Sequence, residues 1–329
     1  MRKALPDLDE PLLDVVSLAR RGPSGRLSPE EVALVVRTLR RAPEVIVKVS
    51  GGAGSSAGAL AHLKYIDRHG ELELETDEGI KVKGGDAGRS VVEDWELDVL
   101  AVRLRSPYRG TAGRKPSKLV HNIVLSMPSG TSPAKLLAAS RNFARDEFAL
   151  KHRYLMVLHT DQEHPHVHLV VKAVGEDGRR LNIRKATLRG WRREFAVQLR
   201  AQGVAANATE RAVRGQVRPP VRDGIYRAAE RGELRRRHEH LMPVPRRPGV
   251  ASGKHERGAE RLQETRRKIV EAWGIVSTQM LNAGHPLADE VWQFLGRMPK
   301  PQTEQAVLKN ISETRLDEER QLKRDERTR

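Results

Sequence analysis

The sequence predicts an α+β fold in which helices pack on a largely antiparallel sheet. Apolar segments rich in β-branched residues are typical of strands, and four of them occur at 45–49, 119–127, 154–158 and 167–174. Segments with apolar residues at helical spacing lie between most of these strands. Only a short polar loop joins the last two strands, and short connections of this kind favour antiparallel pairing.

The first part of the chain, residues 1–43, is expected to form a helical extension ahead of the sheet. Its run SPEE at 28–31 is typical of a helix start, because a capping serine is followed by a proline and two acids. A glycine and serine loop at 50–56 follows the first strand, and a helix is predicted over 57–69, ending at Gly70. The loop lacks the Gly-x4-Gly-Lys-Ser/Thr pattern of nucleotide-binding loops, which speaks against an NTP site.

The middle of the chain continues with alternating strands and helices. Residues 71–75 alternate glutamate and leucine, which predicts an exposed strand. A helix is expected over 91–102, followed by a basic glycine and proline loop at 106–118. Two further helices are predicted, from 132 to about 152 and over 186–202, because apolar residues recur there at helical spacing.

Changes in composition divide the chain into four parts. Residues 44–215 contain all the strong strand signals and form the expected central domain, after the extension of 1–43. Residues 216–258 carry two proline clusters and favour an extended basic linker. Residues 259–329 mix charges of both signs with apolar residues and are predicted to form a helical C-terminal region.

The composition favours a polyanionic partner. The 329 residues include 60 Lys and Arg against 43 Asp and Glu, a formal charge of +17, which indicates nucleic acid before other partners. Cysteine is absent, which excludes disulfides, thiolate metal ligands and thiol nucleophiles. No apolar run approaches the ~20 residues of a membrane span, and acids interrupt the N-terminal apolar residues, so no signal peptide and a cytoplasmic location are expected.

A hairpin rich in histidine is the most informative stretch, with five of the twelve histidines between His152 and His168. Side chains two residues apart share one face of a strand. His159 and Asp161 therefore share a face of the first strand, and His166 shares a face of the second with His168. Pairing close to the loop would bring three imidazoles to one point.

Three imidazoles at one point are suited to a metal. Three protein ligands leave coordination positions open for water or substrate, as catalytic metals need. Asp161 is placed to accept a ring N–H from one ligand and so fix its tautomer. His164 has the opposite parity and adjoins Pro165, so it is interpreted as a loop residue. The ordinary alternative is that these histidines are satisfied surface or edge-strand groups.

Two motifs resemble those of a known family. The string HTDQEHPHVHLVV, residues 159–171, resembles the third motif of conjugative relaxases and mobilisation nucleases in the HUH endonuclease superfamily, of the variety that includes the T-DNA border endonuclease. HLKYIDRHG, residues 62–70, resembles the first motif, in which a tyrosine precedes a polar run ending Arg-x-Gly. The resemblance covers roughly residues 44–215 and implies an antiparallel sheet with packed helices.

The resemblance also implies roles for particular residues. His159, His166 and His168 would hold a divalent metal against the scissile phosphate. Tyr65 would be the nucleophile, and Tyr154 is its main competitor among the four tyrosines.

The function implied is that of a relaxase, which nicks the transfer origin of a conjugative or mobilisable element by tyrosine transesterification. The products would be a 5′-phosphotyrosyl link and a free 3′-OH. The resemblance favours Mg²⁺ or Mn²⁺, whereas histidine ligands alone would favour zinc, manganese, cobalt or nickel. Implied partners are single-stranded and origin DNA, auxiliary relaxosome proteins and a type IV secretion coupling protein. Export with the DNA from the bacterial cytoplasm into a recipient cell is also implied.

Basic residues extend the expected DNA interface. Residues 177–257 carry 21 Lys and Arg against 8 Asp and Glu, and these cations can neutralise phosphates. A solvated basic surface is the alternative. The DNA contacts expected beside the metal site are Arg68, Arg184, Lys185, Arg192 and Arg193.

Two other function classes remain open. One is a metal hydrolase of other substrates that uses three histidines, and the net charge and the Tyr65 motif speak against it. The other is a non-catalytic single-stranded DNA-binding protein of the transfer machinery, which intact ligand histidines speak against.

Overall fold

A computed structural model of the chain describes residues 14–104, 117–216, 255–300 and 314. These residues fall into two compact units. The sheet unit spans Arg41–Ala208 in the described part of the chain, and the helical unit joins residues 14–40 to the described residues from Thr209 onward. The predicted division into four parts remains a proposal, and most of the predicted linker, 217–254, lies outside the described residues.

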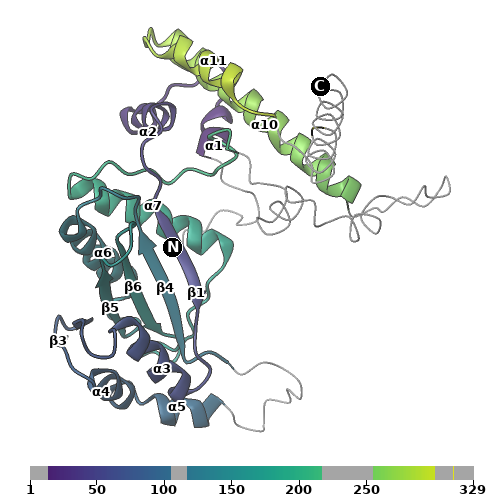
Figure 1. Ribbon diagram of the computed structural model, residues 1–329. Helices are drawn as coiled ribbons and strands as arrows, with labels where there is room; N and C mark the ends of the chain where they lie inside the picture. The colour runs from purple at the N-terminus through teal and green to yellow at the C-terminus, as the bar shows by residue number, and fades with distance from the viewer. Residues whose placement is uncertain (1–13, 105–116, 217–254, 301–313, 315–329) are drawn as a thin grey trace, which may run out of the picture. The chain divides into compact units, whose positions relative to one another are not determined.

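A six-stranded sheet forms the centre of the sheet unit, and every pairing in it is antiparallel (Figure 1). Across the sheet the strands are β1 (Ile46–Gly51), β4 (Val120–Ser126), β6 (His166–Lys172), β5 (Tyr154–His159), β2 (Leu74–Thr76) and β3 (Lys81–Val82). The α+β fold with a largely antiparallel sheet is therefore confirmed.

One face of the sheet is covered by α6 (Pro133–Phe148) and α7 (Lys185–Ala201). The ring of Phe143 lies at the middle of this core, with ring centroids at 6.1 Å from Phe148, 6.3 Å from Trp191 and 5.8 Å from Phe195. Edge-to-face contacts at these separations add to the stability that apolar burial provides. A few aromatic residues at one point thus hold both helices on the sheet.

The opposite face is covered by α3 (Ser56–Ile66), α4 (Ala87–Asp94) and α5 (Leu97–Leu104). Ser55 caps α3, because its hydroxyl accepts the N–H of Gly58 at 3.1 Å. Leu63 and Ile66 of α3 are buried against Leu155 and Val157 of β5 in one core cluster. Figure 1 shows α3 on this side of the sheet. We call this face of the sheet the α3 face.

Several predicted elements differ in extent. The strand expected at 71–75 forms only at Leu74–Thr76, and Leu74 is buried because this segment pairs with β5 and packs under the helices. The helix expected at 91–102 breaks into α4 and α5 at Glu96, whose φ is +50°. Trp95, immediately before the break, is fully buried in the core. The loop expected at 106–118 lies almost wholly outside the described residues.

The helical unit joins both ends of the described chain. It contains α1 (Asp14–Ala19), α2 (Pro29–Leu39), α10 (His255–Asn282) and α11 (Ala288–Arg297). The helix expected after the SPEE run is α2, and its start carries a capping box between Ser28 and Glu31. Gln279 of α10 donates to the carbonyls of Leu18 and Gly22 at 3.2 and 2.7 Å. The two terminal regions, treated as separate in the sequence, therefore share one core.

No helix in the described part of the chain combines the length and the apolar content that crossing a bilayer requires.

Candidate active site

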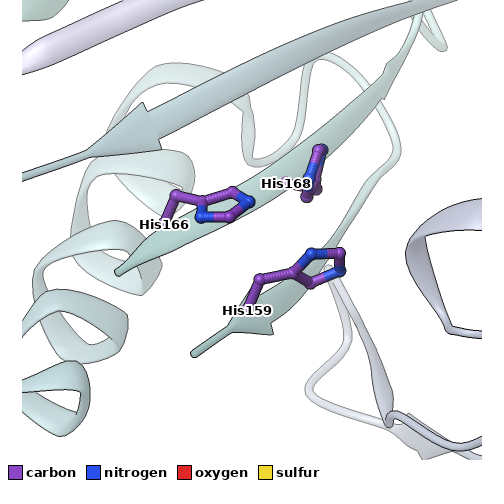
Figure 2. Close-up of side chains that lie close together, drawn as sticks. All are labelled: His159, His166 and His168. Atoms are coloured by element: carbon purple, nitrogen blue, oxygen red, sulfur yellow. The ribbon is translucent and has the colours of Figure 1, made fainter. Parts of the chain in front are cut away.

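Three histidines converge where the β5–β6 hairpin meets its loop. His159 pairs directly with His166, so the strands stay in register up to the turn. His159, His166 and His168 each offer a ligand atom, and these atoms lie within 4.8 Å of one another. Their ring centroids are 4.5 to 5.0 Å apart. Figure 2 shows the three rings turned toward a common point, as the strand parity predicts.

The end of helix α3 determines the tautomer of His159. The last carbonyls of a helix lack intrahelical donors, and that of Ile66 lies 2.6 Å from Nε2 of His159. Because a carbonyl can only accept, Nε2 carries the ring proton of His159. Nδ1 therefore keeps its lone pair for another partner.

The loop of the hairpin determines the tautomer of His166. Its Nδ1–H donates to the carbonyl of His164 at 3.0 Å, which leaves the lone pair on Nε2. His164 in turn accepts the backbone N–H of Ser129 on its Nδ1 at 3.1 Å. His164 is thus a loop residue that supports a neighbour and does not join the three converging histidines, as the sequence predicts.

Two of the three histidines, His159 and His168, have lowered pKa values and so carry neutral rings near pH 7. Burial, with repulsion from the neighbouring histidines, lowers the pKa of His168 to about 3. Burial also lowers the pKa of His159, although its bond to Ile66 opposes the change. Neutral imidazoles with free lone pairs are the ligands that divalent transition metals take from proteins, so this set of donors fits a metal.

Tyr65 lies on the same face as the histidines, at the end of α3. Its side chain is 56% exposed, so its hydroxyl is accessible from solvent. The guanidinium of Arg68 lies 5.4 Å from the centre of its ring. Tyr65 therefore exposes its side chain on the same face of the sheet as the cluster of histidines.

Tyr154, the competing tyrosine, is directed the other way. It is only 4% exposed, belongs to the core under α6 and α7, and packs on Phe148 at 6.2 Å. Burial raises the pKa of its hydroxyl. Tyr108 and Tyr226 lie outside the described residues. Of the described tyrosines, Tyr65 alone shares the α3 face with the histidines.

Asp161 has a different partner from the one expected. Its Oδ2 accepts from Nη2 of Arg68 at 2.5 Å, and this bond lowers the pKa of the carboxyl group. Its Oδ1 lies 3.9 Å from Nδ1 of His159, which is too far for a hydrogen bond. The expected role of Asp161 in fixing a ligand tautomer is thus taken by two backbone carbonyls, those of Ile66 and His164.

A strained turn after α3 aims Arg68 at the histidines. Arg68 and His69 have φ of +53° and +59°, a left-handed conformation that side chains disfavour, and Gly70 follows at +93°. Asp67, which is buried, closes the turn by accepting the N–H of Gly70 on Oδ1 at 3.1 Å. Strain of this kind persists where the surrounding structure requires it. Here the strained turn places the guanidinium of Arg68 beside His159.

His62 lies beside these groups and is not among the site residues that the sequence predicts. Its ring stacks on Tyr65 at 6.3 Å and meets His168 edge-on at 6.2 Å. Burial lowers its pKa, and its Nε2 is buried with no hydrogen-bond partner. The signal that could have revealed it is its position three residues before Tyr65, which places both on one side of a helix.

The basic residues expected beside the metal site lie elsewhere. Arg184 precedes α7 as its N-cap, while Lys185, Arg192 and Arg193 are part of it. This helix packs on the face opposite the histidines. The structure therefore brings Arg68 to the histidines and leaves these four apart from them.

Part of the chain matches a known protein family. Residues 82–203 match the family Relaxase: MobA/VirD2-like, nuclease domain. This segment contains the three histidines and begins after Tyr65.

Two relatives are similar over a longer stretch. The T-DNA border endonuclease VirD2 of Rhizobium radiobacter is 28% identical over 203 residues, which cover 57% of this chain and 47% of the relative. That of Agrobacterium fabrum is 27% identical over 207 residues, covering 58% and 45%. The match spans about half the length of these relatives, and it confirms the resemblance to the relaxases.

Proposed function

We propose that this chain, which carries a MobA/VirD2-like relaxase nuclease domain, is a site- and strand-specific DNA relaxase that nicks the transfer origin of a conjugative or mobilisable element. One observation carries the proposal. An exposed tyrosine, Tyr65, lies on the same face of the sheet as three converging histidines. A nucleophile beside a metal-binding cluster is what a phosphodiester transesterase needs.

The reaction transfers one phosphodiester bond from DNA to protein. The Tyr65 oxygen loses its proton and attacks the phosphorus, forming a phosphotyrosyl bond to the 5′ side. The bond between phosphorus and the 3′ oxygen breaks, and that oxygen takes up a proton to become a free 3′-OH. The number of phosphodiester bonds is unchanged, so the same residues can catalyse rejoining by the reverse path.

The three histidines would hold the divalent cation of this reaction. When bound, such an ion polarises a non-bridging phosphate oxygen and stabilises the charge that develops there. Phosphate oxygens add hard ligands, so Mg²⁺ or Mn²⁺ is proposed first, with Zn²⁺ as the alternative that nitrogen ligands favour. Ile66 and His164 hold two of the rings in the tautomers that leave lone pairs for the ion.

The residues around Tyr65 orient the reacting groups. The ring of Tyr65 stacks on the ring of His62 and has the guanidinium of Arg68 over its face, and these contacts restrict its position. Arg68 is proposed to contact the DNA phosphate next to the nick, and Asp161 anchors the guanidinium. Positioning of this kind supplies much of the rate in phosphoryl transfer.

The substrate proposed is single-stranded DNA of a transfer origin, for which the net charge of +17 provides long-range attraction. Arg184, Lys185, Arg192 and Arg193 are proposed to add phosphate contacts. Relaxosome proteins and a type IV secretion coupling protein are the proposed partners, and export from the bacterial cytoplasm with the DNA is the proposed route.

A covalent-adduct assay tests the function. The full chain is incubated with an end-labelled single-stranded oligonucleotide library and Mn²⁺, then separated on a denaturing gel. A relaxase leaves one DNA fragment attached to the protein. Cleavage into two free fragments would indicate a hydrolase instead, and binding without cleavage would indicate a non-catalytic DNA-binding protein.

A further inference from the structure

Arg68 makes a contact that bears directly on metal binding. Its Nη2 lies 3.2 Å from Nδ1 of His159, as well as 2.5 Å from Oδ2 of Asp161. The two hydrogen bonds of the His159 ring require the same tautomer. Ile66 offers only a carbonyl and so needs a proton on Nε2, whereas Arg68 offers only N–H groups and so needs the lone pair on Nδ1.

Nδ1 is also the only ring nitrogen of His159 that can bind a metal without breaking the bond to Ile66. Nε2 is already bonded to Ile66 at 2.6 Å, which leaves Nδ1 as the ligand atom. Figure 2 shows this edge of the His159 ring turned toward the other two histidines. A ring nitrogen has one lone pair, which can accept either the Arg68 proton or a metal ion. The two partners exclude each other.

We propose that Arg68 is a positioning residue that caps Nδ1 of His159, the atom that binds the metal. When a metal ion enters, the N–H of Arg68 loses His159 as its acceptor and donates to the substrate phosphate instead. This inference rests on the proposed metal-dependent function and gives Arg68 a role toward the metal in addition to its proposed contact with DNA. Uptake of the ion removes the N–H from Nδ1, while the bond to Asp161 keeps the guanidinium in place. The released donor then faces the region where Tyr65 and the scissile phosphate meet.

Three features keep Arg68 at this position in both states. The left-handed turn of Arg68 and His69 directs the side chain toward the hairpin. Asp161 holds it by a charge-assisted bond, which is stronger than a neutral one. The ring of Tyr65 offers its face at 5.4 Å, where a cation is attracted. The guanidinium of Arg68 thus contacts both His159 and the proposed nucleophile Tyr65.

Metal affinity measured without DNA tests the inference. Mn²⁺ is titrated calorimetrically into the full-length chain at pH 7.5 for wild type, Arg68→Gln, Asp161→Asn and the double variant. Arg68→Gln should bind Mn²⁺ about tenfold more tightly, because both the competing donor and a nearby positive charge are removed. Arg145→Gln removes a charge from the opposite face of the sheet and should leave the affinity unchanged.

Asp161 separates capping from a direct metal role. Asp161→Asn should weaken Mn²⁺ binding about tenfold, because it leaves the Arg68 charge uncompensated, and Arg68→Gln in the same chain should restore it. If the double variant stayed weak, Asp161 would act on the metal itself and the anchoring role would be refuted. If Arg68→Gln alone bound Mn²⁺ as tightly as wild type or more weakly, the inference that Arg68 caps Nδ1 of His159 would be overturned.

A measurement on the unmodified protein keeps the inference testable if a variant misfolds. In the metal-free chain, ¹⁵N spectra of His159 should show the proton on Nε2, and the Nδ1 signal should shift when diamagnetic Zn²⁺ is added. A proton on Nδ1 would overturn the inference while leaving the relaxase function intact. Wild-type protein that forms the DNA adduct with Mn²⁺ but never shows a metal-dependent shift at His159 would also overturn it.

Discussion

The carbonyl oxygen of Ile66 accepts the Nε2–H of His159 at 2.6 Å, and this bond joins the helix that carries Tyr65 to the strand that carries the first histidine. The two residues are 93 positions apart in the chain. The unpaired end of a helix here orients the ring of a histidine in the converging cluster.

The histidine cluster predicts a contrast between neighbouring histidines. His159→Ala, His166→Ala or His168→Ala should each abolish cleavage and leave DNA affinity largely intact, since phosphate contacts elsewhere supply most of the binding. His164→Ala should be mild, because the group that holds His166 is the backbone carbonyl, which alanine retains. Gel cleavage and filter binding measure the two effects. Equal severity at His164 would contradict the assignment.

The two tyrosines of the sheet unit predict opposite outcomes. Tyr65→Phe should lose cleavage, because the ring still packs but the attacking oxygen is gone. Tyr154→Phe should keep cleavage, since that side chain is buried on the other face of the sheet. A denaturing gel followed by peptide mapping of the adduct distinguishes them. An adduct mapped to Tyr154 would refute the assignment.

The basic residues of α7 predict a salt effect without a catalytic one. Neutralising Arg192 and Arg193 should weaken DNA binding and flatten the log–log salt dependence by about 0.7 per lost contact to single-stranded DNA. Because α7 covers the face away from the histidines, cleavage at saturating DNA should be unchanged. The salt slope from fluorescence anisotropy is the measurement. A slope that stays constant after Arg184 and Lys185 are neutralised as well would remove all four from the interface.

The lowered histidine pKa values predict acid sensitivity. The unfolded pKa of histidine is about 6.5, whereas that of His168 in the fold is about 3, so the unfolded chain binds more protons between these values. The free energy of unfolding should therefore fall as the pH drops through this window, by at most about 1.4 kcal/mol per pH unit for one proton. Urea titrations at pH 7 and pH 5 measure the effect.

The substitution His168→Gln tests how much His168 contributes to the pH dependence of the free energy of unfolding. His168→Gln should flatten the pH dependence, while His121, whose pKa burial lowers to about 4, keeps its own contribution in both proteins. An identical pH dependence in wild type and His168→Gln would show that His168 is not buried as a neutral ring.

The turn after α3 predicts a difference between two glycines. Gly70→Ala should cost about 2 kcal/mol or more, because φ is +93° and the added Cβ would lie 2.6 Å from the carbonyl carbon of Gly84. Gly79→Ala is the matched control, with φ of +78° but open space around it, and should cost about 1 kcal/mol. Thermal or urea unfolding compares them. Equal costs would mean that the contact with Gly84 is relieved easily.

Local patterns determined much of this protein. The alternation in the β5–β6 hairpin was enough to place His159, His166 and His168 on one face, because the period of two along a strand is independent of the rest of the chain. The same parity excluded His164. Helical spacing and the motif around Tyr65 located the candidate nucleophile on a helix, and the charge balance indicated a polyanionic partner.

Only the tertiary structure decided which distant groups meet. Arg68 and Asp161 are 93 residues apart, and no local periodicity shows that a turn after α3 would point one at the other. The face on which α7 packs, which removes Arg192 and Arg193 from the histidines, depends on how a whole helix is docked. The shared core of the two terminal regions also depends on how whole helices are docked. These outcomes depend on which apolar surfaces are buried together, and this is a property of the assembled layers and not of any single segment.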